Sequence, residues 1–172
     1  PHGMLDPYIL SSQGTIKRIL GKVLFRKSFS EVNCFQALCQ KELEDIRAYG
    51  LTQPVAIIPN GVNLPNQDVT YSKKDEKKHL LFLGRLHPKK GVDLLIKSIA
   101  ELKKSTPNVL NNWVVDIVGW DHENTEVNLR NLVKINNLDD IVKFHGGLFG
   151  DEKVSMYANA TAYILPSHGE GL

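Results

Sequence analysis

Three basic residues follow a short apolar run near the middle of the chain. Residues 80–83 predict a buried strand, and Arg85, Lys89 and Lys90 come soon after it, with Gly84 at the turn. Ligands of open α/β sheets bind beyond the carboxyl ends of the strands, where fixed cations suit a phosphate group. The spacing therefore predicts a phosphate-binding loop, and a solvated basic loop without a ligand is the alternative.

A second candidate for chemistry lies in the last residues, 166–172, which read Pro-Ser-His-Gly-Glu-Gly-Leu. Small residues after a strand usually precede a helix whose free backbone N–H groups can hold an anion. The Glu170 carboxylate would repel a phosphate, but it can accept hydrogen bonds from sugar or ribose hydroxyls. The alternative is a helix-start carboxylate that the helix dipole stabilises.

Alternating strands and helices must position these residues. The expected strands are 80–83, 113–118, 141–144 and 161–166, and the expected helices are 92–104, 126–135 and 151–159. This alternation predicts an α/β, Rossmann-like parallel sheet with right-handed crossovers and helices on both faces. Its strands should end at one edge, at Gly84, Gly119, Gly146 and Ser167, which is the expected binding crevice.

The first part of the chain contains a predicted basic helix and a smaller strand-helix-strand segment. Residues 15–29 combine apolar residues at helical spacing with five Lys or Arg and no acid. Such a helix can lie on an anionic membrane surface, or simply pack on a core with its basic face in water. Residues 31–38 predict a strand that passes into a helix reaching Ala48, and residues 54–59 predict another strand. Residues 62–78 are rich in Pro, Asn, Ser, Lys and Asp, which indicates a linker.

Composition excludes several classes of protein. The 172 residues are 42% hydrophobic and carry a formal net charge of +2, and the basic residues are scattered without interleaved aromatics, so nucleic acid is not an expected partner. Neither a Gly-x-Gly-x-x-Gly fingerprint nor a Walker loop is present, which disfavours a dehydrogenase or P-loop nucleotidase. The two cysteines, Cys34 and Cys39, fit neither a zinc site nor a disulfide framework, and this favours a reducing cytoplasm.

Six short motifs, taken in order, resemble those of a known enzyme family. They are residues 58–63, 82–86 with 89–91, 118–119, 142–146, 157–160 and 165–172. Together they resemble the retaining GT-B glycosyltransferases of the group 1 type, which include capsule, O-antigen and exopolysaccharide sugar transferases related to glycogen and sucrose synthases. The resemblance implies a fragment. Residues 1–62 would end the acceptor domain, 63–79 would be a linker or edge segment, and 80–172 would be a truncated donor-binding domain.

The resemblance also implies roles for individual residues. Arg85 and Lys90 would hold the diphosphate of the donor and stabilise the leaving nucleoside diphosphate, with no metal and no cofactor. Glu170, the first Glu of the family's paired-Glu signature, would face the donor sugar as the third catalytic residue. The nucleotide-sugar pocket would also be lined by Gly84, Gly119, Gly146 and the backbone around Phe144, and Gly171 and Leu172 would offer backbone N–H groups to the donor.

The expected activity is metal-independent, retaining transfer of a sugar from a nucleoside diphosphate to a surface polysaccharide or lipid-linked glycan. We expect a cytoplasmic protein, with peripheral contact to the inner face of the cell membrane through residues 15–29 as a further hypothesis. A non-catalytic nucleotide- or polyphosphate-binding module of the same fold is the alternative function. Since the second Glu of the signature lies beyond Leu172, we expect this chain to bind donor weakly or not at all, to be inactive alone and to self-associate through bare apolar surface.

Overall fold

The computed structural model describes residue 5 and residues 28–62, 76–121 and 123–169. Their contacts divide the chain into two compact units, one within residues 1–63 together with residues 169–172, and the other within residues 64–168. Each unit is described by itself below. The predicted domain limits at 62 and 79 concern the whole enzyme and stay predictions.

The first unit is built around a strand-helix-strand segment. Strand β1 (Phe35–Ala37), helix α3 (Gln40–Ala48) and strand β2 (Val55–Ile57) follow one another, and β1 and β2 pair in parallel. The carboxylate of Glu42 is buried, and its Oε2 accepts a 2.6 Å hydrogen bond from the backbone N–H of Leu38, ahead of the helix. Both strands were expected, but β1 begins later than the apolar pattern of residues 31–38 indicates.

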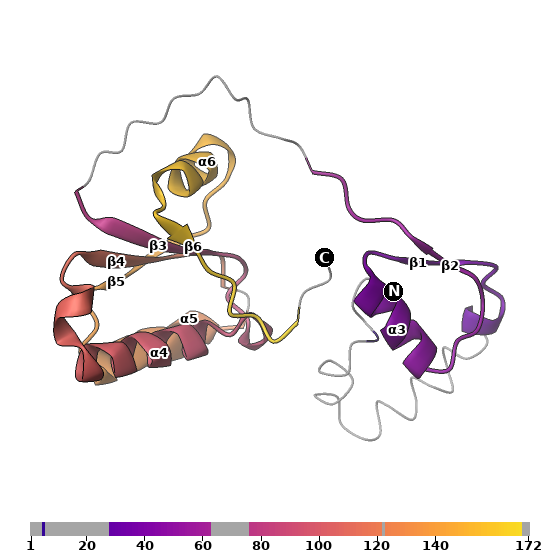
Figure 1. Ribbon diagram of the computed structural model, residues 1–172, viewed down its shortest axis with the longest axis horizontal. Helices are drawn as coiled ribbons and strands as arrows, with labels where there is room; N and C mark the ends of the chain where they lie inside the picture. The colour runs from indigo at the N-terminus through magenta and orange to yellow at the C-terminus, as the bar shows by residue number, and fades with distance from the viewer. Residues whose placement is uncertain (1–4, 6–27, 63–75, 122, 170–172) are drawn as a thin grey trace. The chain divides into compact units, whose positions relative to one another are not determined.

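The second unit is a four-stranded parallel sheet with helices on both faces. Its elements are β3 (Lys78–Leu83), η1 (Pro88–Lys90), α4 (Val92–Ser105), η2 (Pro107–Leu110), β4 (Trp113–Val118), α5 (Thr125–Ile135), β5 (Val142–Gly146), α6 (Gly150–Asn159) and β6 (Ala162–Tyr163). The strand order is β5-β4-β3-β6, and every pairing is parallel. Figure 1 shows α4 and α5 on one face of the sheet and α6 on the other. The predicted α/β architecture is confirmed.

The main core of this unit lies between the sheet and helices α4 and α5. Helix α4 has a buried apolar stripe at the spacing of a helix, with Ile96 fully enclosed. From the sheet, Phe82 of β3 and Val115 and Ile117 of β4 enter the same cluster. Because side chains alternate along a strand, Asp116 points to the opposite face of the sheet, on which α6 lies (Figure 1).

Some expectations about local structure need correction. Strand β6 includes only Ala162 and Tyr163, not residues 161–166, and Pro166 lies in irregular backbone after it. Pro88 starts the 3₁₀ turn η1, because the first helical position tolerates a residue without an N–H group. The predicted membrane-surface helix falls largely on residues 15–27, outside the described residues. Among the helices that the structure describes, none has the length and apolar character to cross a membrane.

Candidate functional site

Backbone contacts between three glycines form the carboxyl edge of the sheet. The N–H of Gly84 donates to the carbonyl of Val118 at 2.9 Å, and the N–H of Gly119 donates to the carbonyl of Gly146 at 2.7 Å. A Cβ atom on Gly119 would lie only 1.9 Å from the carbonyl oxygen of Gly84. The strand ends therefore meet backbone to backbone, as expected, with no side chain between Gly84 and Gly119.

The next residues place Arg85 beside an aromatic ring. Leu86 is 1% exposed, and its N–H donates to the carbonyl of Trp120 at 3.1 Å, which continues the pairing beyond β3 and β4. With Leu86 anchored inward, Arg85 is exposed, and its guanidinium carbon lies 5.9 Å from the centre of the Trp120 ring. This arrangement is a cation–π contact, and it gives the Arg85 charge a preferred position at the sheet edge.

The turn that carries Lys90 is held at several points. The N–H of Lys89 donates to Nδ1 of His87 at 3.1 Å, and the carbonyl of Lys89 accepts a 2.9 Å hydrogen bond from the N–H of His168. Gly91 has a φ of 64°, and a Cβ atom there would lie 2.1 Å from the carbonyl oxygen of Pro166. The loop with Lys90 is thus fastened to the segment that precedes Glu170.

Most of the predicted site residues that the structure describes lie at this edge. Arg85 and Lys90 are on the loop between β3 and α4, and the glycines at 84, 119 and 146 end three neighbouring strands. Phe144 differs, because its ring packs against the core and under the Arg130 guanidinium, 4.5 Å from the ring centre. Only the backbone of Phe144 is therefore placed to line a pocket at this edge. The predicted residues Glu170, Gly171 and Leu172 lie outside the described residues.

Two residues of the β4–α5 loop were not singled out from the sequence. Trp120, which supports Arg85, directly follows Gly119, and an aromatic residue directly after a predicted strand end was the available signal. Asp121 accepts from the N–H groups of Thr125 and Glu126, each at 3.0 Å, and so satisfies free donors at the start of α5. Asp121 lies four residues before Thr125, outside the N-cap position that Asn124 occupies, so no local sequence signal indicated this role.

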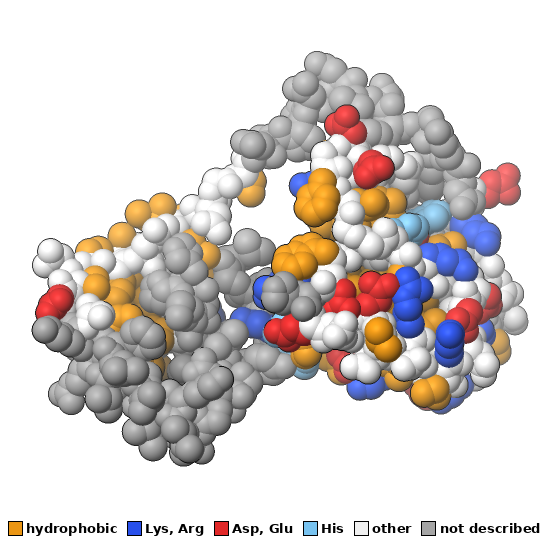
Figure 2. Space-filling view, turned by 180° about the vertical axis from the view of Figure 1, so that it is seen from behind, with side chains coloured by type: hydrophobic (Ala, Val, Ile, Leu, Met, Phe, Trp, Pro, Cys, Tyr) orange, Lys and Arg blue, Asp and Glu red, His pale blue; other side chains and the backbone are white. Residues whose placement is uncertain are grey.

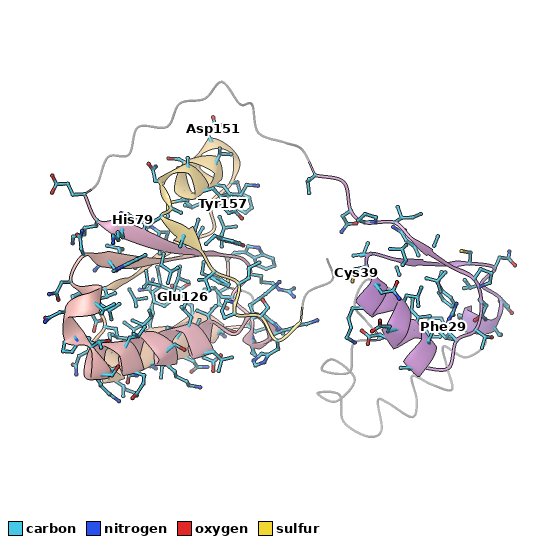
Figure 3. All side chains as sticks on the ribbon, in the orientation of Figure 1. Phe29, Cys39, His79, Glu126, Asp151 and Tyr157 are labelled. Carbon is cyan, nitrogen blue, oxygen red and sulfur yellow. The ribbon has the colours of Figure 1, made fainter. Side chains whose placement is uncertain are left out.

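A buried carboxylate joins three strands outside this edge. Asp116 is 3% exposed, with His79 Nδ1 at 2.6 Å from Oδ2 and His145 Nε2 at 2.7 Å from Oδ1. His79 belongs to β3, where Figure 3 labels it, Asp116 belongs to β4 and His145 belongs to β5. Within the described part of the chain, no set of three or more His, Cys, Asp or Glu side chains is arranged to hold a metal ion. We interpret the Asp116 cluster as a structural link between strands.

Comparison with known proteins agrees with this architecture. A D-inositol 3-phosphate glycosyltransferase from Arthrobacter sp. (strain FB24) is 30% identical over 94 residues, which cover 55% of this chain and 22% of that protein. An uncharacterised glycosyltransferase from Haemophilus influenzae (strain Rd) is 38% identical over 100 residues, covering 58% of the chain and 26% of that protein. The chain therefore matches about a quarter of the length of these curated relatives.

Solved structures share the fold. Sucrose-phosphate synthase from Thermosynechococcus elongatus has a TM-score of 0.72 at 19% identity, over 100% of this chain and 44% of that one. S. aureus TarM has a TM-score of 0.70 at 18% identity, over 88% and 29%. The model of the family "Glycosyl transferases group 1" matches residues 65–172, which is more than half of the chain. With its parallel sheet and basic edge loop, the chain belongs to this glycosyltransferase family.

Proposed function

We propose that this chain is part of a hexosyltransferase-type enzyme. The reaction is metal-independent transfer of a sugar from a nucleoside diphosphate to a surface polysaccharide or lipid-linked glycan, with retention of the anomeric configuration. The donor binds at the carboxyl edge of the β3–β4–β5 sheet.

The observation that supports this proposal is the position of Arg85 and Lys90. Both lie on the loop that leaves β3, beside the glycines at the ends of the neighbouring strands. When the bond between the anomeric carbon and the diphosphate breaks, negative charge develops on the diphosphate. Fixed cations held at that point stabilise the charge more in the transition state than in the ground state, which is what accelerates a reaction.

The remaining roles rest on the motif at the end of the chain. Glu170 would face the donor sugar and accept hydrogen bonds from its hydroxyls. The backbone N–H groups of Gly171 and Leu172 would bind the donor from the same side. The hydrogen bond from His168 to Lys89 supports this arrangement, because it holds the preceding residues against the loop of Lys90.

Nucleotide binding tests the location of the site. We would titrate this chain calorimetrically with UDP, GDP and ADP, beginning with UDP because the solved structures of S. aureus TarM and Anabaena HepE are complexes with UDP. Binding of one nucleotide should weaken about tenfold or more in Arg85→Ala, since a charge-assisted hydrogen bond is lost. Lys104→Ala is the control, because Lys104 is also an exposed cation but lies in the last turn of α4, outside the proposed donor site.

Turnover by the full-length enzyme separates the proposal from a non-catalytic binding module. Arg85→Ala should lower the rate of sugar transfer by about 10²-fold or more, as expected when one group that stabilises developing negative charge is removed. A full-length protein that binds the nucleotide but transfers no sugar would favour the binding module. If neither this chain nor the full-length protein binds any of the nucleotides, the proposed site is wrong.

We also propose a cytoplasmic location with peripheral contact to the inner face of the cell membrane through residues 15–29. The support is the charge pattern of that segment, which carries five basic residues and no acidic one. Failure to sediment with anionic vesicles at low salt would contradict the membrane contact and leave the proposed catalytic activity unaffected.

A further inference from the structure

A cavity of about 480 Å³ lies along the outer side of the sheet, between α5 and β5. It is lined by Arg130, Val133 and Lys134 of α5, by Asp139 of the connecting turn and by residues 142–145 of β5. Strand β5 is the outermost strand of the described sheet on this side, so one row of its backbone groups faces away from β4. The volume is within the range of sites that hold small molecules.

This α5–β5 pocket extends along β5 to His145, next to Gly146, but its end at Lys134 lies away from the candidate donor site. Helix α5 connects two parallel strands, so it runs back along the sheet, and its last turn lies near the start of β5. Lys134 and Asp139 are therefore near the amino end of the strands, whereas Gly119 and Gly146 are at the carboxyl end. A phosphate held by the Lys134 ammonium would therefore lie toward the opposite end of the strands from the place proposed for the nucleotide sugar.

The cationic side chains of the pocket retain free hydrogen-bond donors. Glu126, which Figure 3 labels, accepts at 2.7 Å from Nε of Arg130, and the Phe144 ring supports the guanidinium from below. Arg130 still has N–H groups to offer, because a guanidinium carries five. Lys143 uses one donor of its ammonium on the carbonyl of Asp139 at 2.7 Å. The Lys134 ammonium has no hydrogen bond or ion pair within the part of the chain that the structure describes.

The charges around the pocket are unbalanced. Three permanent cations, Arg130, Lys134 and Lys143, line it together with the carboxylate of Asp139. When the Glu126 carboxylate that pairs with Arg130 is counted as well, an excess of one positive charge remains. Figure 2 shows that Lys and Arg side chains, with histidine beside them, gather along one side of this unit. A dianion with several acceptor oxygens fits three cationic donors better than a single carboxylate does, and a planar guanidinium matches phosphate geometry.

We propose that the α5–β5 pocket binds a phosphate group, as a second anion site separate from the donor site. Arg130, held in place by Glu126 and Phe144, contacts two phosphate oxygens, and Lys134 and Lys143 add their ammonium groups. The phosphate belongs either to a free phosphorylated small molecule or to the headgroup of a lipid. Both sources present the same chemistry to the pocket, and the experiment below distinguishes them.

The first test uses inorganic phosphate as the probe on this chain, at low ionic strength in a phosphate-free buffer. Amide resonances of α5 and β5 should shift and saturate in ¹H–¹⁵N spectra. The dissociation constant should rise about tenfold in Lys134→Ala, because a charge-assisted contact is lost, and further in the double variant Lys134→Ala/Lys143→Ala. Lys104→Ala is the matched control, since Lys104 occupies the last turn of α4 as Lys134 occupies that of α5.

The second test identifies the source of the phosphate by co-sedimentation with phosphatidylglycerol vesicles, against phosphatidylcholine as reference. The phosphate belongs to a lipid headgroup if the unaltered chain and Lys104→Ala both sediment with phosphatidylglycerol vesicles and the double variant does not. Saturable phosphate binding without such sedimentation indicates a free phosphorylated ligand. The proposal is overturned if the α5 and β5 amides do not shift with phosphate at millimolar concentration, or if the double variant binds phosphate as tightly as the unaltered chain. Arg85→Ala should leave these shifts unchanged.

Discussion

Gly119 and Gly84 approach so closely that a Cβ atom on Gly119 would lie 1.9 Å from the carbonyl oxygen of Gly84. The contact sets the distance between the ends of β3 and β4, and hence the position of Arg85 relative to Trp120. Gly84 would tolerate a side chain better than Gly119. The nearest atom to a Cβ atom on Gly84 would be in the Phe82 ring, at 3.4 Å, which is an ordinary contact distance.

Gly119→Ala should therefore destabilise the protein by about 1–3 kcal/mol or more, since the added methyl group forces the strand ends apart. Urea unfolding measures the effect. Gly84→Ala is the control, and it should have a much smaller effect on the free energy of unfolding. Equal stability of the two variants would show that the strand ends separate at little cost, contrary to the close packing described above.

The link from Asp116 to two histidines predicts a second stability effect. Asp116→Ala removes the carboxylate that contacts both His79 and His145 and should cost about 1–3 kcal/mol. Asp116→Asn, which keeps the shape and one acceptor oxygen, should cost less. An alanine variant as stable as the unaltered chain in urea unfolding would mean that the cluster contributes nothing to the fold.

Two surface carboxylates, those of Asp93 and Asp140, make the free energy of unfolding depend on pH. Burial raises the pKa of Asp93, but its hydrogen bond from Lys97 at 2.8 Å and the charge of Lys97 outweigh this and hold the pKa below the ordinary 3.8. Burial likewise raises the pKa of Asp140. The hydrogen bond from Lys103 and the positive charges of Lys103 and Lys143 outweigh burial, so the pKa of Asp140 lies below its ordinary value. A lowered pKa in the folded state stabilises the protein above pH 3.8, and this contribution is lost as the pH falls through the lowered value.

We therefore expect the free energy of unfolding to fall on acidification below about pH 4, in part because of these two groups. The double variant Asp93→Asn/Asp140→Asn should show a shallower fall in that window and no altered slope near pH 7. The difference should be small and should shrink with added salt, because both pairs are on the surface. If the free energy of unfolding of the double variant and of the unaltered chain fell equally below pH 4 at low salt, the two carboxylates would not contribute to the pH dependence.

The agreement between sequence and structure is best where the apolar pattern is strong and local. Helix α4 and strand β4 lie where the residue periodicity places them. Helix α4 buries one face, and β4 buries both of its faces, so the apolar pattern of each is clear. The limits of β6 could not be derived this way. A strand at the border of the sheet ends where its pairing ends, and β6 pairs with β3 only through Ala162 and Tyr163.

The candidate site shows the same division between local and long-range information. The basic residues at 85 and 90 are visible in the sequence, and so is their place after a strand. Their neighbours are not, because the contact between Arg85 and Trp120 depends on the register that aligns Leu83 with Val118. Likewise, no local pattern indicated that α5 would place Arg130 over the ring of Phe144.

Exposed apolar residues near β6 predict self-association. Tyr163 and Leu165 are each at least 40% exposed, although the Tyr163 hydroxyl donates to the carbonyl of Leu83 at 3.1 Å and its ring lies 5.4 Å from that of Tyr157. Figure 3 shows Tyr157 of α6 directed toward this strand. Strand β6 is the last strand of the described sheet on its side and carries no charged residue that would block pairing with another chain.

Light scattering at micromolar concentration should therefore detect dimers or larger species, and Leu165→Lys should shift them toward monomer. Val127→Lys places the same charge at an exposed apolar position of α5 and should leave the association unchanged. A monodisperse monomer for the unaltered chain would rule out self-association.

The Asp116 carboxylate also affects the chain before it folds. Without that charge, β4 would consist only of apolar residues of high β propensity, from Trp113 to Val118. Segments of this kind pair with copies of themselves when exposed, and one charge within the segment is an effective barrier to such pairing. In the native sheet, the flanking histidines compensate for burying the charge. We therefore expect Asp116 to act as a gatekeeper that protects β4 from aggregation during folding, and in the folded sheet it links β4 to both of its neighbours.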